Sequence, residues 1–182
     1  MPDKGSALRD ILEREHPAIV ERWLEAVLAT YPEDSAKFLR TQRDQFANPV
    51  GATLSKELHS VFDELVRGET VQSTREFLDR IIRIRAVQDF SPAAALAFVF
   101  DLKQIVREVV LKEVMERGLL EELARFEARI DEMGLIAFNI YVECREKLYE
   151  LRVQEVKRGA YLLLKKAEMI VETPSGESQP VM

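Results

Sequence analysis

The sequence of 182 residues predicts an all-α fold, a helical bundle followed by a long C-terminal helix. Almost every segment carries apolar residues at steps of three and four, which is the period of a helix with one buried face. No run of four or more residues alternates cleanly between apolar and polar side chains, as half-buried strands do. With 47% hydrophobic residues, a chain of this length can bury one proper core.

Three short helices are expected before residue 47, separated by the prolines at positions 17 and 32. Proline suits the first turn of a helix, because the N–H group that it lacks would have no partner there. The first helix is expected to begin after Ser6, whose hydroxyl can cap backbone N–H groups. Asp34 or Ser35 is expected to cap the third helix, which then extends to Phe46.

Three further helices have strong start and stop signals. Asn48-Pro49 and Ser91-Pro92 each combine a capping side chain with a proline in the first turn. Gly68 and Gly118 suit the left-handed residue that often follows a helix. Between these two helices Thr74 begins another, and its inward face is expected to comprise Phe77, Leu78, Ile81, Ile82 and Val87. The run 93–100 is apolar on nearly all sides, which predicts burial on several sides.

The last segment has the most regular pattern. Its apolar residues follow steps of four and three, the heptad spacing of paired helices, at Leu119, Leu123, Phe126, Ile130, Met133, Ala137, Ile140 and Cys144. The stripe then shifts sideways to Tyr149, Val153, Val156, Ala160, Leu163, Ala167 and Ile170. An exposed apolar stripe is costly in water, and pairing with a second copy removes that cost. We therefore expect a homodimer, with a candidate interface at Leu123, Phe126, Ile130, Tyr149, Val153, Val156 and Leu163.

These patterns divide the chain into three parts. They are a helical bundle over 1–118, a long heptad-patterned helix over 119–172 that packs on the bundle and extends from it, and a disordered tail over 173–182. An unbroken helix over 119–170 would be about 78 Å long at 1.5 Å per residue, so it must project or turn back. Gly134 and Gly159 are the candidate breaks.

Charge and cysteine content argue against several classes of function. The formal net charge of -6 works against attraction to nucleic acid. The longest apolar stretch without charges, Phe90–Phe100, is far shorter than the roughly 20 residues of a membrane span, so no membrane insertion is expected. The single cysteine, Cys144, cannot form an internal disulfide, which fits a cytoplasmic location.

No catalytic motif is present: the sequence has no glycine-rich phosphate loop, no GxSxG, no HExxH and no CxxC. We therefore expect no enzymatic activity and no cofactor. The alternative is haem or metal binding at His59 or His16, although a partly buried histidine at the edge of a helix face is the simpler interpretation. Cys144 is expected to fill the core rather than to act as a redox sensor.

Four residues are candidates for contact with an anionic ligand. Arg83 and Arg85 precede the helix start at Ser91, where free N–H groups and the helix dipole favour negative charge. Asn48 and Gly51 form the other proline-led start, and a glycine there permits close approach of a helix or a ligand. The alternatives are a solvated face with weak ion pairs for the arginines and close helix packing for Gly51.

Residues 46–51 read FANPVG and residues 83–92 read RIRAVQDFSP, with Leu102-Lys103 following. These strings resemble the RsbRD amino-terminal domain family, the sensor domain of co-antagonists of the RsbT kinase, and the similarity covers most of residues 6–155. The resemblance implies a globin-like bundle without haem, dimeric through its terminal helices, whose last helix leads into a STAS domain. No STAS domain follows residue 170, so a stand-alone form is expected. Stand-alone relatives occur in anaerobes near genes for membrane redox complexes.

We therefore expect a non-catalytic cytoplasmic module that senses, regulates or binds a protein partner as a homodimer. Two alternatives stay open: a haem- or metal-binding redox or gas sensor, and an accessory protein of an anaerobic membrane redox complex.

Overall fold

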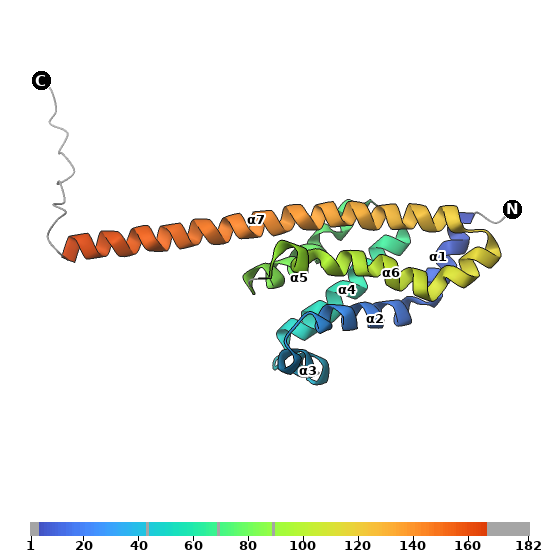
Figure 1. Ribbon diagram of the computed structural model, residues 1–182, viewed down its shortest axis with the longest axis horizontal. Coiled ribbons are helices and arrows are strands. Elements are labelled where there is room, and N and C mark those ends of the chain that lie inside the picture. Colours follow the sequence, from blue (N-terminus) through green and yellow to red (C-terminus); the bar gives the residue numbers. More distant parts are fainter. Residues whose placement is uncertain (1–3, 43, 69, 89, 167–182) are drawn as a thin grey trace, which may run out of the picture. The chain divides into compact units, whose positions relative to one another are not determined.

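The computed structural model describes residues 4–42, 44–68, 70–88 and 90–166 (Figure 1). Within these ranges the chain forms no strand, only a 3₁₀ helix (Val71–Thr74) and α-helices: α1 (Lys4–Arg14), α2 (His16–Ala29), α3 (Glu33–Thr41), α4 (Pro49–Arg67), α5 (Arg75–Val87), α6 (Pro92–Arg117) and α7 (Leu120–Lys166). The predicted all-α class is confirmed, and the globin-like arrangement stays a prediction. No described helix combines the length and the apolar character that a membrane crossing requires.

The chain divides into two compact units, Met1–Arg145 and Glu146–Met182. The predicted division lay earlier, at residue 118, in front of the long helix. The two differ because the first half of α7 contributes buried side chains to the core of the first unit. The second unit is helical over 146–166. The predicted helical residues 167–172 and the predicted tail 173–182 lie outside the described residues.

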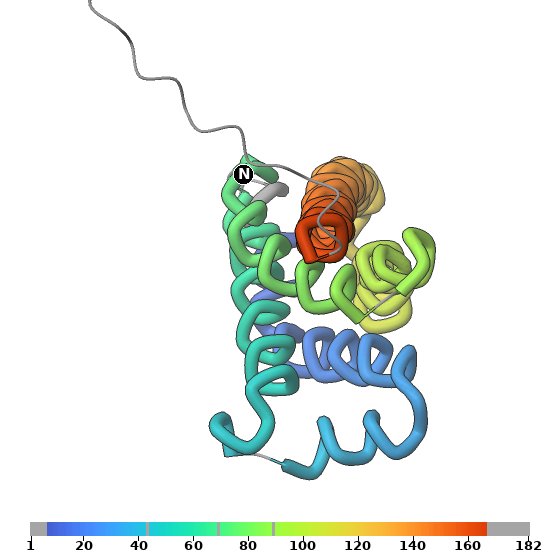
Figure 2. Tube along the Cα trace, turned by 90° about the vertical axis from the view of Figure 1, so that its left-hand side faces the viewer, coloured from blue at the N-terminus to red at the C-terminus, as the bar shows by residue number. Residues whose placement is uncertain are grey.

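Four helices build the centre of the first unit. Helix α2 packs against α6 and α4, and Figure 2 shows α4 in blue-green along one side of this unit, in contact with α2 and α5. The indole of Trp23 in α2 is fully buried and donates its Nε1–H to the carbonyl oxygen of Phe98 in α6 at 2.6 Å. Its ring also stacks on that of Phe98, with centroids 5.9 Å apart. This pair joins α2 to α6 while giving the buried N–H group a partner.

Both proline-led starts and both glycine stops are confirmed. The side chain of Asn48 accepts a hydrogen bond from the Gly51 N–H at 2.9 Å, and that of Ser91 accepts one from the first turn of α6 at 3.2 Å. Gly68 and Gly118 follow α4 and α6 with φ of 77° and 67°, a left-handed conformation that glycine adopts without strain.

The expected limits of α1 and α3 are wrong. Helix α1 begins at Lys4, so Ser6 lies inside it. Helix α3 begins at Glu33 without a side-chain cap, and both Asp34 and Ser35 lie within it. It ends at Thr41, and Phe46 is 97% exposed in the following turn. The N–H of Phe46 donates to the side chain of Asp44 there, a local bond that competes with helix.

The first apolar stripe of α7 is buried inside the first unit. Leu123, Phe126 and Ile130 all belong to its core, where the ring of Phe126 meets that of Phe62 from α4 edge to face. This burial contradicts the prediction that Leu123, Phe126 and Ile130 lie at a dimer interface, because the same chain already covers them.

Helix α7 continues through both glycines that were candidate breaks. Gly134 is buried, and a Cβ atom built on it would lie only 2.7 Å from Cζ of Phe100. The glycine therefore leaves room for a ring from α6 to pack on the backbone of α7.

Asn48→Ala is expected to lower the free energy of unfolding by about 2–3 kcal/mol. Besides its capping bond, Asn48 donates through Nδ2 to the carbonyls of Leu39 (3.0 Å) and Gln42 (2.9 Å), so alanine loses three bonds. Urea denaturation followed by circular dichroism measures the change. Ser91→Ala, which removes one exposed cap, is the control and should cost about 1 kcal/mol or less. Equal losses in both variants would contradict this assignment.

Leu123→Lys is expected to destabilise the first unit by about 3 kcal/mol or more, because it places an ammonium group in the core. The matched control is Leu135→Lys on the same helix, where the side chain is exposed and little change is expected. Thermal unfolding compares the two. A Leu123→Lys variant as stable as the control would show that this position is not core.

Candidate functional site

Arg85 is the most unusual side chain of the first unit, a guanidinium with 0% exposure. Helix α5 places it there, because Arg85 follows Leu78, Ile81 and Ile82 in the helical register of the buried face. Val87, which was predicted to face inward, is exposed at the last residue of this helix. Of the two arginines predicted as ligand contacts, only Arg85 therefore enters the interior.

Three bonds from Arg85 are made to neutral oxygens. Its Nη2 donates to Oγ1 of Thr30 at 3.0 Å and to the carbonyl oxygen of Ala94 at 2.7 Å. Its Nε donates to the carbonyl oxygen of Ala95 at 3.1 Å. The third nitrogen, Nη1, is buried and has no hydrogen-bond partner.

Aromatic rings surround the same guanidinium. Its carbon lies 4.3 Å from the ring centroid of Phe90, and 5.7 Å from those of Tyr31 and Phe98. Such contacts stabilise a cation, but they replace water only in part. Burial lowers the pKa of Arg85. Burial also raises the pKa of the Asp101 carboxyl, and the positive charge of Arg85 opposes part of that increase.

A surface groove of about 360 Å³ lies over this centre and is lined by Thr30, Tyr31, Pro32, Gln88 and Phe90. A second hollow of about 400 Å³ shares Tyr31 and Gln88 with it and is also lined by Phe38 of α3 and Val50 of α4. The hydroxyl of Tyr31 donates to Oε1 of Gln88 at 3.0 Å. The two hollows therefore meet at one exposed hydrogen bond.

The other predicted ligand contacts are fully engaged in local structure. The side-chain amide of Asn48 makes three hydrogen bonds at the start of α4. A Cβ atom built on Gly51 would lie 2.3 Å from Nδ2 of Asn48. The glycine thus makes room for the cap rather than for a second helix. Both residues also line a hollow of about 260 Å³. Arg83 is exposed and pairs with Asp79 one turn earlier.

His16 and His59 lie side by side, with ring centroids 5.5 Å apart, although 43 positions separate them in the sequence. Nε2 of His16 lies 3.0 Å from Oδ1 of Asp63, and Nδ1 of His59 lies 2.7 Å from the carbonyl oxygen of Ser55. In the described part of the chain, no group of three or more His, Cys, Asp or Glu side chains is arranged to hold a metal ion. The alternative of a metal or haem site at His59 gains no support from this arrangement.

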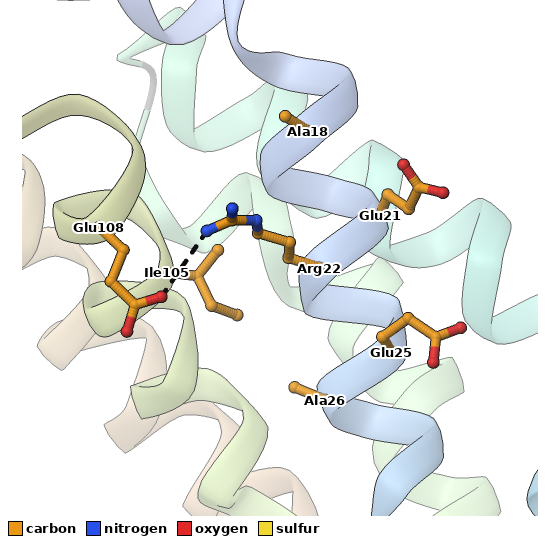
Figure 3. Close-up of a pocket in the computed structure, with 7 residues that line it drawn as sticks. All are labelled: Ala18, Glu21, Arg22, Glu25, Ala26, Ile105 and Glu108. Atoms are coloured by element: carbon orange, nitrogen blue, oxygen red, sulfur yellow. Dashed lines mark ion pairs between the residues drawn. The ribbon is translucent and has the colours of Figure 1, made fainter.

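Another hollow, of about 580 Å³, lies between α2 and α6 and is lined by Ala18, Glu21, Arg22, Glu25, Ala26, Ile105 and Glu108 (Figure 3). Arg22 reaches toward Glu108, with 3.7 Å between the charged atoms. Figure 3 shows Glu21 and Glu25 pointing away from the gap that Arg22 spans. The charged groups are exposed and do not converge, so the hollow offers no focused binding chemistry.

The second apolar stripe of α7 is exposed, unlike the first. Four of its members have exposed fractions of 53%, 51%, 71% and 70%, in the order Tyr149, Val153, Val156 and Leu163. These four are the predicted interface residues that remain accessible to a partner.

Tyr31, Gln88 and Phe90, which line the groove beside Arg85, were not among the predicted site residues. The sequence places each of them in a loop or at a helix end. The neighbouring residues do not indicate that they come together, because 57 positions separate Tyr31 from Gln88. A signal for Arg85 itself was present, because this arginine occupies the buried register of α5. Arg85 was instead predicted, together with Arg83, to contact an anionic ligand, with a solvated face as the alternative, and its burial in the core was not expected.

Comparison with known proteins gives one family and one relative. The family model described as "RsbT co-antagonist protein rsbRD N-terminal domain" matches residues 17–156. An uncharacterized protein of Archaeoglobus fulgidus is 26% identical over 153 residues, which cover 81% of this chain and 88% of that protein. No solved structure matches the chain.

Cys144 is expected to react much more slowly with iodoacetamide in the folded protein than in urea. Only the thiolate reacts, and burial raises the pKa of this thiol, with the charge of Arg83 opposing the shift. At pH 8 the native rate should be lower by about 100-fold, since reaction also requires local opening. Mass spectrometry follows the adduct, with Cys144→Ser as the unreactive control. Equal rates in buffer and in urea would contradict a role in the core.

Proposed function

Because the chain belongs to the RsbRD N-terminal domain family, we propose that it is a non-catalytic cytoplasmic sensory module that dimerises through the second half of α7. The family is one of regulatory domains in stress signalling. The observation that carries the proposal for this chain is the exposed heptad stripe of α7.

The stripe has the chemistry of a helix-pairing seam. Tyr149, Val153, Val156, Ala160 and Leu163 follow steps of four, three, four and three, while charged residues occupy positions between them. Burial of apolar surface stabilises by about 25 cal/mol per Å², so several such side chains on each of two helices favour pairing. Pairing of identical helices is the simplest way to cover an identical stripe.

A regulatory rather than catalytic role agrees with the chemistry of the described residues. Arg85 donates to carbonyl and hydroxyl oxygens and stacks on aromatic rings, and none of these contacts with described residues supplies an activated nucleophile or a general base. Cytoplasmic location is supported by a single cysteine that is buried as a thiol.

Light scattering at about 50 μM is expected to give a mass near twice 20.9 kDa. Val153→Lys combined with Val156→Lys should produce the monomer without loss of stability, because both positions are exposed and the lysines would meet across the seam. We expect the dimer to weaken by about 100-fold or more.

The matched control is Gln154→Lys, which adds the same side chain next to the stripe at an exposed polar position. This variant should remain dimeric. A wild-type protein that is monomeric at this concentration would contradict the dimer proposal. A dimeric Val153→Lys/Val156→Lys variant would contradict it as well.

A further inference from the structure

No described carboxylate forms an ion pair or a hydrogen bond with the buried guanidinium of Arg85, although the charge of Asp101 acts on it from a distance. None of the ion pairs between described side chains includes Arg85, and its Nη1 atom has no hydrogen-bond partner. A buried cation with an unmet donor is costly, because carbonyl dipoles and rings replace only part of its hydration. An anion that reached Nη1 would offset that cost directly.

Side chains that line the groove cover Arg85 on the side of Tyr31 and Phe90. Three of the five residues that line the groove contact the guanidinium: Thr30 by a hydrogen bond, and Tyr31 and Phe90 through their rings. Both rings are only partly buried. The bond from Tyr31 to Gln88 is exposed, so opening it costs about 1 kcal/mol or less.

The geometry restricts the kind of anion. Nε and Nη2 are already engaged, so only the Nη1 group can donate to a ligand. One guanidinium balances one negative charge, whereas a phosphate dianion presents more charge and more acceptor oxygens than this group can meet. The groove walls are aromatic or apolar at Tyr31, Pro32 and Phe90, which suits an apolar ligand body.

We propose that Arg85 and the groove of Thr30, Tyr31, Pro32, Gln88 and Phe90 form a binding site for a small apolar monocarboxylate. The carboxylate accepts from Nη1 of Arg85 after the rings of Tyr31 and Phe90 move apart, and the apolar body occupies the groove. The site goes beyond the sensory function proposed above and does not depend on the dimer.

Occupancy of this site would be felt at α7 within the first unit. The hydroxyl of Tyr141 on α7 donates to the carbonyl oxygen of Phe90 at 2.7 Å. Displacement of Phe90 would therefore lengthen or break this hydrogen bond. Nη1 of Arg145, near the end of the unit, donates to the carbonyl oxygen of Ala86 at 3.3 Å. Two hydrogen bonds therefore link the backbone near Arg85 to the first half of α7.

Trp23 provides a built-in reporter, because it is the single tryptophan and stacks on Phe98, whose ring lies 5.7 Å from the Arg85 carbon. The test is a fluorescence titration of the full chain with sodium butyrate, with butyramide as the uncharged isostere and inorganic phosphate as the dianion. Butyrate should give a saturable change and raise the melting temperature. Butyramide and phosphate should bind at least about tenfold more weakly.

Two variants at Gln88 test the geometry without disturbing the core, since Gln88 is exposed. Gln88→Glu places a competing carboxylate beside the groove and should weaken butyrate binding by about tenfold. Gln88→Ala removes the bond to Tyr31 and should leave binding equal or tighter.

Arg85→Met should abolish the response, with circular dichroism as the check on folding. Arg83→Met is the matched control and should bind butyrate like the wild type, because Arg83 is exposed. Absence of a saturable butyrate response would overturn the proposal, as would equal responses to butyrate and butyramide. An undiminished response in Gln88→Glu, or loss of binding in Arg83→Met, would also overturn it.

Discussion

Burial of the first apolar stripe of α7 is the constraint on which the first unit depends. Leu123, Phe126 and Ile130 complete a core that α2, α4, α5 and α6 begin, and the ring contact of Phe126 with Phe62 joins residues far apart in the sequence. Without this stripe, α6 and α4 would each expose an apolar face to water. The bundle and the first half of the long helix are therefore one cooperative structure.

Within that core, Arg85 breaks the rule that charged groups stay outside or are paired. Its bonds to Thr30 and to the first turn of α6 join α2, α5 and α6 at one point. Hydrogen bonds to three neutral oxygens position the guanidinium without neutralising it. This combination holds a positive charge beneath a surface groove, which is a reason to consider it a ligand centre rather than a simple structural brace.

Local signals were enough to predict much of the fold. Asn48, Ser91, Gly68 and Gly118 each determine a helix end through bonds or backbone conformation within a few residues, so their roles follow from the neighbouring sequence. Contacts between distant segments were not predictable in the same way. The meeting of Tyr31 with Gln88, and of His16 with His59, depends on how helices cross, which no single segment specifies.

The heptad pattern of α7 shows what a pattern specifies and what it leaves open. Up to Cys144 the stripe is buried, and from Tyr149 it is exposed, although the residue types and the spacing are similar. The step between these two residues is five positions, and at about 100° per residue it turns the stripe by about 140° around the helix. This turn does not by itself explain the exposure, because Leu151, which lies seven residues after Cys144 on the earlier face, is 52% exposed as well. The pattern predicts an apolar stripe in both halves, while its burial depends on whether other helices of the chain pack beside it, which the pattern does not specify.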